Sequence, residues 1–176
     1  PQATEACSIG LAPTTSTTMA LALGDALAVT LMQERKFSSE NFKILHPGGK
    51  LGAQMIKVNQ LMHTGEKIPR VKPNSSMPNT LIEMTSKGFG VAIIVENDII
   101  TGVITDGDLR RHMDDLMSMT AQEIGSNEPI TIEEDKLAVK ALSIMNEKKI
   151  NVIIVTNKRN SPVGILHIHD CLRAGL

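Results

Sequence analysis

Two copies of one ten-residue pattern decide the fold of this chain: GVITDGDLRR at residues 102–111 and GILHIHDCLR at residues 164–173. A glycine, two branched apolar residues, an aspartate and a final arginine recur in register. Each copy follows a run of mostly β-branched residues, VAIIV at 91–95 and NVIIV at 151–155, and such runs predict buried strands. The repetition therefore predicts two copies of one strand-containing unit.

Helical patterns lie on both sides of each predicted strand pair. Apolar residues recur at helical spacing over 137–145, and residues 80–84 form the corresponding segment of the first copy. After the glycine-containing strand a further helix is expected to begin at Asp108 and at Asp170, where a carboxylate suits the helix start. Each copy thus has the order β-α-β-β-α. We expect a mixed α/β (α+β) fold in which two such repeats pack face to face.

The first third of the chain differs in kind. A hydroxyl-rich stretch at 12–18 leads into residues 19–32, which are apolar almost all round and predict a helix buried on every side. Because residues 1–57 show no strand to cover this helix, we expect them to belong to a larger domain. The predicted organisation is this helical segment, a first repeat at 58–118 and a second at 119–176.

Composition excludes several classes of partner. The 18 Lys and Arg residues balance 19 Asp and Glu residues, so a net charge of −1 favours neither nucleic acid nor an anionic membrane. Aromatic residues make up 2% of the chain, which argues against base stacking on aromatic rings. No uninterrupted apolar stretch approaches about 20 residues, and the start resembles no signal peptide. We expect a soluble cytoplasmic protein with Cys7 and Cys171 as free thiols.

Several long motifs resemble a known family. The segments EAC at 5–7, LAPTTSTT at 11–18, GDALA at 24–28 and HPGGKLG at 46–52 are similar to the C-terminal part of the sugar isomerase (SIS) domain of bacterial D-arabinose 5-phosphate isomerases. The repeats, with TDGDLRR at 105–111, resemble the tandem cystathionine-β-synthase (CBS) domain pair of the same family. The resemblance covers the whole chain, and it implies that a helical remnant of a SIS domain precedes a tandem CBS pair.

The resemblance also implies an activity for the intact protein. The family interconverts D-ribulose 5-phosphate and D-arabinose 5-phosphate for 3-deoxy-D-manno-octulosonate (Kdo) synthesis, which serves lipopolysaccharide or capsule. Such a reaction needs an acid, a base and a phosphate anchor. By motif match Glu5 is the candidate proton shuttle and His46 the candidate for ring opening or acid–base transfer. Taken alone, Glu5 reads as a solvated carboxylate and His46 as a loop residue. Without most of the catalytic domain, this chain by itself is not expected to turn over substrate.

A ligand site is expected in the CBS pair. In adenosyl-binding relatives a Thr or Ser after the last strand and an Asp three residues on reach the phosphate and ribose, and Thr105 and Asp108 match that spacing. Arg110 and Arg111 add positive charge nearby. In the second repeat His167 replaces the threonine, which puts a standard nucleotide site there in doubt, and Asp170 is retained. The alternative is that Asp108 and Asp170 only cap their helices, a role worth about 1 kcal/mol each.

The other histidines suggest no metal centre. His167 and His169 alternate and are expected to face one way, but no third ligand has a fixed spacing. His63 and His112 have no partner pattern. We therefore expect neither a metal nor a cofactor.

Two functions remain open for the CBS pair. One is a regulatory module that senses a nucleotide or nucleotide-sugar such as CMP-Kdo, while the SIS domain of the intact enzyme binds the sugar phosphate. The other is an oligomerisation module that binds nothing. In either case the family implies a homo-oligomer, with dimers of CBS pairs and a tetramer when the enzyme is intact.

Overall fold

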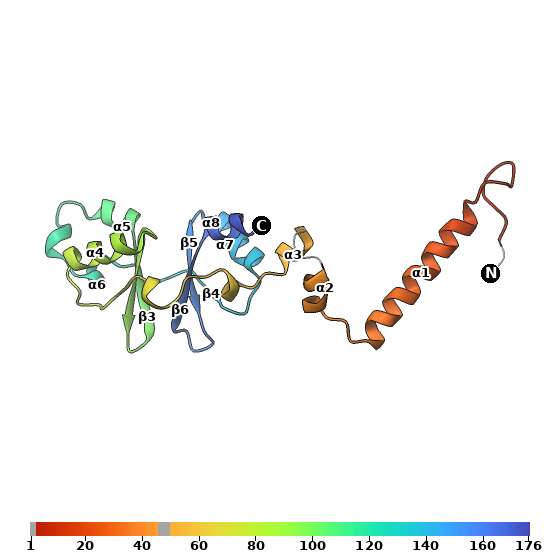
Figure 1. Cartoon of the computed structure of the whole chain (residues 1–176). Coiled ribbons are helices and arrows are strands. Elements are labelled where there is room, and N and C mark those ends of the chain that lie inside the picture. Colours follow the sequence, from red (N-terminus) through yellow and green to blue (C-terminus); the bar gives the residue numbers. More distant parts are fainter. Residues whose placement is uncertain (1–2, 46–49) are drawn as a thin grey trace. The chain divides into compact units, whose positions relative to one another are not determined.

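The computed structural model describes residues 3–45 and 50–176, and the chain divides into two units near residue 46 (Figure 1). The N-terminal unit contains helices α1 (Thr15–Glu34) and α2 (Ser39–Leu45). The C-terminal unit begins with the short helix α3 (Lys50–Gln54) and holds both sheets. The two units are described separately below.

The first repeat forms a three-stranded sheet with the order β1-β2-β3. Strand β1 (Arg70–Val71) lies parallel to β2 (Val91–Glu96), and β2 pairs antiparallel with β3 (Ile99–Thr105). Helix α4 (Met77–Lys87) links β1 to β2, and α5 (Asp106–Arg111) follows β3 directly. Short 3-10 turns at Val58–Gln60 and Gly65–Lys67 precede β1. The predicted β-α-β-β-α order is confirmed for this repeat.

The second repeat has the same topology. Strand β4 (Thr131–Glu133) is parallel to β5 (Val152–Thr156), which pairs antiparallel with β6 (Pro162–His167). Helix α7 (Ala138–Lys148) joins β4 to β5, and α8 (Ile168–Arg173) follows β6. A 3-10 turn at Leu116–Ser118 and helix α6 (Ala121–Ile124) connect the two repeats.

Three apolar clusters hold the C-terminal unit together. Each repeat has its own cluster between its sheet and helices, around Met84 and Ile104 in the first and around Met145 and Leu166 in the second. A third cluster contains Ile93 of β2 together with Ile154 of β5. Since these two strands belong to different repeats, their shared cluster confirms that the repeats pack into one module. The adjacent sheets are visible in Figure 1.

The recurring glycine of each repeat lies where another segment crosses its strand. Val103 exchanges two backbone hydrogen bonds with Ser126, at 2.9 Å each, and Ile165 does the same with His63 at 2.8 and 2.9 Å. A Cβ atom on Gly102 would lie 3.0 Å from the backbone oxygen of Ser126. On Gly164 it would lie 2.4 Å from Met62 Sδ. The glycine that defines the repeat therefore lies where a Cβ atom would meet the crossing segment: its backbone oxygen at Gly102, and the Met62 side chain as well as the His63 backbone oxygen at Gly164.

Helix α1 is apolar on every side, as its sequence predicts, yet none of its residues is buried. Leu21 is 70% exposed and Leu27 57% exposed. The helix is longer than the apolar run 19–32, because it includes the hydroxyl-bearing residues 15–18 at its start and residues 33–34 at its end. Its 20-residue length and composition would allow it to cross a membrane, although core helices of soluble proteins have the same properties.

Candidate functional site

A cleft of about 530 Å³ lies in the C-terminal unit, and both repeats contribute to its walls. The first repeat provides Thr105, Asp108 and Arg111, from the end of β3 and from α5. The second repeat provides Ser126 and residues 149–152, which lead into β5. This volume is within the range of small-molecule binding sites. The structure thus brings Thr105, Asp108 and Arg111 of the predicted CBS ligand contacts together in one cleft, with Arg110 beside them.

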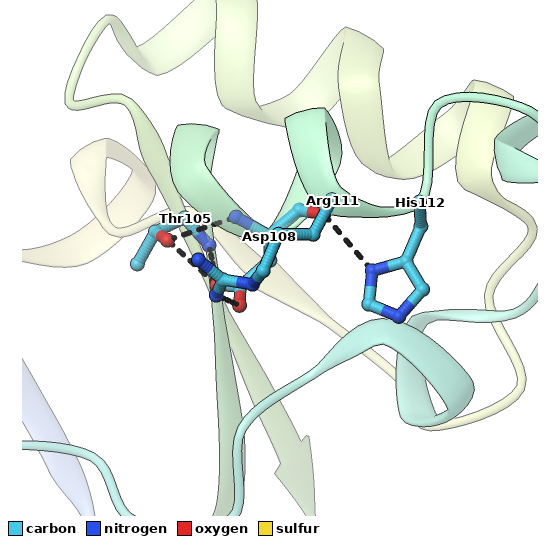
Figure 2. A network of polar contacts seen from close by, with 4 residues as sticks. All are labelled: Thr105, Asp108, Arg111 and His112. Atoms are coloured by element: carbon cyan, nitrogen blue, oxygen red, sulfur yellow. Dashed lines mark hydrogen bonds and ion pairs between the residues drawn. The ribbon is translucent and has the colours of Figure 1, made fainter.

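Thr105 and Asp108 form a capping box at the start of α5, shown in Figure 2. The backbone N–H of Thr105 donates to Asp108 Oδ2 at 2.8 Å, and the Thr105 hydroxyl donates to the same oxygen at 2.6 Å. In return, the Asp108 N–H donates to Thr105 Oγ1 at 3.3 Å. The capping role considered for Asp108 is therefore confirmed, and its ligand-binding role stays a prediction.

The Asp108 carboxylate is almost fully buried, with 5% of the residue exposed. Burial alone would raise the pKa of this carboxyl. The hydroxyl and N–H of Thr105 and the charge of Arg111 outweigh that effect and hold the pKa below its ordinary value. Arg111 bonds to Asp108 Oδ1, and its side chain is 66% exposed. His112, for which the sequence suggests no partner, places Nδ1 3.0 Å from the Asp108 backbone oxygen (Figure 2).

His167 and Asp170 begin α8 in the same way, but they are not among the residues that line the cleft. The His167 N–H donates to Asp170 Oδ2 at 3.2 Å. The His63 ring, from the segment before β1, places Nε2 3.0 Å from the same oxygen. His63 thus has a partner that its sequence context does not reveal, because the contact spans 107 positions in the chain.

The rings of His167 and His169 stack with centroids 4.9 Å apart. They lie together because the His169 N–H donates to His167 Nδ1 at 3.1 Å, at a helix start rather than along a strand. Burial, and then the neighbouring His169, lower the pKa of His167. Over residues 3–45 and 50–176, no group of three or more His, Cys, Asp or Glu side chains is arranged to hold a metal ion.

Sequence reasoning missed several residues of the cleft. Lys149, Asn151 and Ser126 come from the second repeat and lie across from Thr105. Phe89 also lines the cleft, although the low aromatic content argues against an aromatic contact there. The aligned repeats could have identified Phe89, Lys149 and Asn151, since the segment before β5 corresponds to the segment before β2. Ser126 is identified only by its backbone pairing with Val103.

Of the two candidate catalytic residues, the structure describes Glu5, in the N-terminal unit. The Glu5 carboxylate accepts hydrogen bonds from the backbone N–H groups of Thr14, Thr15 and Ser16, at 2.7, 2.8 and 3.3 Å. A hydrogen bond from the Ser16 hydroxyl, and then these backbone bonds at the start of α1, lower its pKa to about 2. His46 lies outside the described residues. The catalytic roles of both residues stay predictions.

The thiols of Cys7 and Cys171 are both free, as expected. Burial raises the pKa of Cys171, and hydrogen bonds from the backbone N–H groups of its own loop lower that of Cys7.

The sequence of the chain is similar to those of arabinose 5-phosphate isomerases. The chain is 43% identical over 177 residues to the arabinose 5-phosphate isomerase KdsD of Pseudomonas aeruginosa, covering 98% of this chain and 54% of the relative. It is also 43% identical over 179 residues to KdsD of Escherichia coli K12, covering 99% of this chain and 54% of that relative. The chain therefore spans about half the length of these relatives.

Solved structures resemble the C-terminal unit. CBSX2 in complex with AMP matches with a TM-score of 0.61 and 19% identity, over 68% of this chain and 96% of that one. The CBS domain protein PAE2072 from Pyrobaculum aerophilum, complexed with AMP, matches with a TM-score of 0.58 and 22% identity, over 65% of this chain and 89% of that one. These likenesses show a shared fold. The CBS domain family model matches residues 58–115 and 121–176, and the chain therefore belongs to the CBS domain family.

Proposed function

We propose that the chain is the regulatory CBS pair of an arabinose 5-phosphate isomerase and binds a nucleotide or nucleotide-sugar in the cleft between its repeats. The observation that carries this proposal is the cleft of about 530 Å³ to which both repeats contribute. A ligand held there would contact both repeats at once, so binding would favour one arrangement of the pair over others. The 43% identity to KdsD enzymes supports the assignment of the pair to an isomerase of that kind.

The cleft offers the chemistry that a phosphorylated nucleoside requires. Arg111 and Lys149 are cations suited to phosphate, and the Asp108 carboxylate can accept from ribose hydroxyls. Phe89 provides one ring for contact with a base. CMP-Kdo, which joins a ribonucleotide to the sugar acid made from arabinose 5-phosphate, is the proposed effector. AMP is the comparison ligand because two CBS proteins of the same fold are solved with it.

Thermal shift measurements with CMP-Kdo, CMP and AMP test the sensing role. A ligand at 100 times its dissociation constant should stabilise the chain by about 2.7 kcal/mol, which raises the melting temperature by several degrees. The variants Thr105→Ala and Asp108→Ala should weaken this rise, and Asp108→Ala should do so more strongly because it removes the buried carboxylate.

Thr120→Ala is the matched control. Thr120 forms a similar capping box with Glu123 at the start of α6, with two bonds of 2.7 Å, but it does not line the cleft. It should therefore lower stability by about 1 kcal/mol, as loss of a cap does, and leave the ligand response intact. Equal responses in the Thr105, Asp108 and Thr120 variants would contradict a ligand site in the cleft.

An oligomerisation module without a ligand is the second candidate. Exposed apolar side chains on the helices of the C-terminal unit favour it, among them Ile82 on α4, 67% exposed, and Leu172 on α8, 52% exposed. We propose a dimer of CBS pairs and a tetramer of the intact enzyme. If no nucleotide raises the melting temperature while light scattering gives a multiple of the 19.0 kDa chain mass, this candidate replaces the first.

For the rest of the isomerase we propose that residues 1–57 belong to a cytoplasmic SIS domain. The exposed apolar surface of α1 supports this assignment, since such a helix is stable in water only when other elements cover it. Glu5 and His46 would act there on the sugar phosphate. The gene sequence upstream of the Pro1 codon is the test. A SIS domain in frame, with interconversion of D-ribulose 5-phosphate and D-arabinose 5-phosphate by the joined protein, is the expected result.

A further inference from the structure

A second pocket, of about 380 Å³, lies within the second repeat. Its walls are the edge strand β4, the first turns of α7 with the residue that precedes them, and the hairpin that joins β5 to β6. The cleft described above takes residues 149–152, at the start of β5, whereas this pocket takes residues 156–158 and 160, at the end of that strand and beyond. No described residue lines both, so the pocket is separate from the nucleotide cleft.

The wall of this pocket contains a buried hydroxyl without a partner. Thr156 is 4% exposed, and its hydroxyl forms no hydrogen bond with any described residue. Within the described part of the chain, every fully enclosed polar side-chain atom has a hydrogen-bond partner, so the Thr156 oxygen keeps an opening, and Thr156 lines the pocket. Thr80, which is also buried, donates instead to the Ser76 backbone oxygen at 3.0 Å. Thr156 thus presents an unsatisfied donor to the pocket.

The fold does not require a hydroxyl at this position. The recurring glycines set the register of the repeats, because they pair with Ile94 in β2 and with Val155 in β5. In that register the counterpart of Thr156 is Val95, which packs against the third apolar cluster. Valine and threonine have nearly the same shape, so an apolar side chain is sufficient for packing here. The hydroxyl is therefore a feature of the second repeat alone.

The pocket is also basic. Lys140 and Lys158 line it and form no ion pair with a described residue, and Lys136 pairs with Glu133 at 3.1 Å. Among the described lining residues Glu133 is the single carboxylate, against three lysines. The corresponding hairpin of the first repeat, END at residues 96–98, carries two carboxylates instead. Two cations without a partner around one small pocket favour an anion.

The hairpin holds a further donor in place. Asn157 Oδ1 accepts from the backbone N–H groups of Arg159 and Ser161, at 2.9 and 3.0 Å. Since that oxygen is used within the hairpin, the Nδ2 group of Asn157 is left to donate to a ligand. Ile132 and Ile144 add an apolar wall that suits a short carbon skeleton. The pocket therefore combines donors and positive charge with room for a small organic group.

We propose that this pocket binds a small phosphomonoester that carries hydroxyl groups. Lys140 and Lys158 offset the two charges of the phosphate, and the Thr156 hydroxyl and the Asn157 amide donate to its oxygens. The Glu133 carboxylate accepts from a hydroxyl group of the ligand. The proposal does not depend on nucleotide binding in the cleft, which uses different residues.

Backbone amide signals followed by NMR in the whole chain test the site. Glycerol 3-phosphate is the probe, and sodium chloride at matched ionic strength is its control. Glycerol 3-phosphate should shift the signals of residues 156–160 saturably and leave those of residues 105–111 in place. Shifts equal to those in chloride would overturn the proposed site.

Parts of the probe identify the ligand class. Glycerol lacks the phosphate and inorganic phosphate lacks the hydroxyl-bearing carbons, so each should bind at least about fivefold more weakly than glycerol 3-phosphate. Glycerate replaces the phosphate by a carboxylate of lower charge and should also bind more weakly. Affinity for inorganic phosphate or glycerate equal to that for glycerol 3-phosphate would overturn the assignment to a phosphomonoester.

Lysine variants test the role of the charge. Lys140→Gln and Lys158→Gln should each weaken glycerol 3-phosphate binding at least about fivefold, because each removes a charge-assisted contact from an exposed side chain that the fold does not need. Lys148→Gln is the matched control. It makes the same change on the same helix α7, with a side chain that is 55% exposed and outside the pocket, and it should keep the affinity.

Thr156→Val is the sharpest variant, because it removes the hydroxyl and keeps the shape. It should leave the melting temperature of the free chain unchanged or raise it, and weaken glycerol 3-phosphate binding several-fold. Thr80→Val should do the opposite, since it loses the bond to Ser76 and lies outside the pocket. Unchanged glycerol 3-phosphate binding in Thr156→Val, Lys140→Gln and Lys158→Gln would overturn the proposal. The AMP response of the same variants reports on the cleft alone, so failure of one site is distinguishable from failure of the other.

Discussion

At the scale of single residues, Thr105 and Asp108 are suited both to capping a helix and to binding a ligand. The motif match assigns Thr105 and Asp108 to a ligand, and the structure shows that they first satisfy each other at the start of α5. A nucleotide would have to share or replace these bonds. Substitution of either residue therefore removes a helix cap as well as any ligand contact. Comparison with Thr120→Ala, which removes a similar cap outside the cleft, separates the effect on ligand binding from the effect on stability.

Glu5 gives a prediction at the residue scale that needs no ligand. Its carboxyl should titrate with a pKa of about 2 instead of the ordinary 4.5, because the Ser16 hydroxyl and the N–H groups at the start of α1 bond to the ionised form. Its contribution to the stability of α1 should therefore be complete above pH 4.5 and be lost as the pH falls through about 2. NMR of the side-chain carboxyl carbon should show Glu5 still mostly ionised at pH 3.

Glu5→Gln should accordingly lower the helicity of residues 15–34, measured from the Cα chemical shifts. Glu34→Gln is the control, because it makes the same charge change in the last turn of α1, far from the free N–H groups. A Glu5 carboxyl that titrates near 4.5 would show that the capping contacts are absent in solution.

At the scale of elements, the repeat glycines connect sequence to packing. Gly102→Ala should lower the free energy of unfolding by about 1 to 3 kcal/mol, because the new Cβ atom would press on the Ser126 backbone oxygen and on Ile94. Urea unfolding followed by circular dichroism measures this change. Gly164→Ala should also destabilise the chain, by less if Met62 can move aside.

Gly107→Ala is the control for this prediction. It lies in α5, and its added Cβ atom would meet only ordinary contacts of 3.4 Å, so it should be neutral or slightly stabilising. A Gly102→Ala midpoint equal to that of Gly107→Ala would mean that the Val103–Ser126 crossing is loose in solution.

At the scale of the whole molecule, stability should be concentrated in the C-terminal unit. All three apolar clusters lie within residues 58–176, and none of the residues of α1 is buried. Hydrogen exchange should therefore find the amides of β5 protected about a thousandfold or more, while those of α1 exchange close to the free rate. Mass spectrometry of peptides from 15–34 and 152–156 makes the comparison.

The same experiment reports on burial of α1. Protection of α1 equal to that of β5 would contradict the prediction and would indicate that a further surface covers the helix in solution. Dilution of the sample then identifies a second copy of the chain as that surface, because protection by association falls with concentration.

The sequence by itself determined the repeat, the order of its strands and helices, and the CBS fold. The repeat and the order of its elements follow from local periodicity, from the β-branched strands and from a pattern that occurs twice, whereas the CBS fold follows from the resemblance of these motifs to the CBS pair of a known family. Residues 80–84 lie inside α4 (Met77–Lys87), and residues 137–145 cover α7 (Ala138–Lys148) from one residue before its start to Met145. The helices expected to begin at Asp108 and Asp170 begin two residues earlier, at Asp106 and Ile168.

Only the tertiary structure decided how distant residues meet. His63 lies beside Asp170, and Lys149 shares a cleft with Thr105, because backbone pairing between the repeats brings separate segments together. Stacking of His167 on His169 likewise depends on a helix start that breaks the strand alternation. Periodicity describes a residue's neighbours within its own element. The residues of a binding site come from different helices and strands, and these come together only when the two sheets pack.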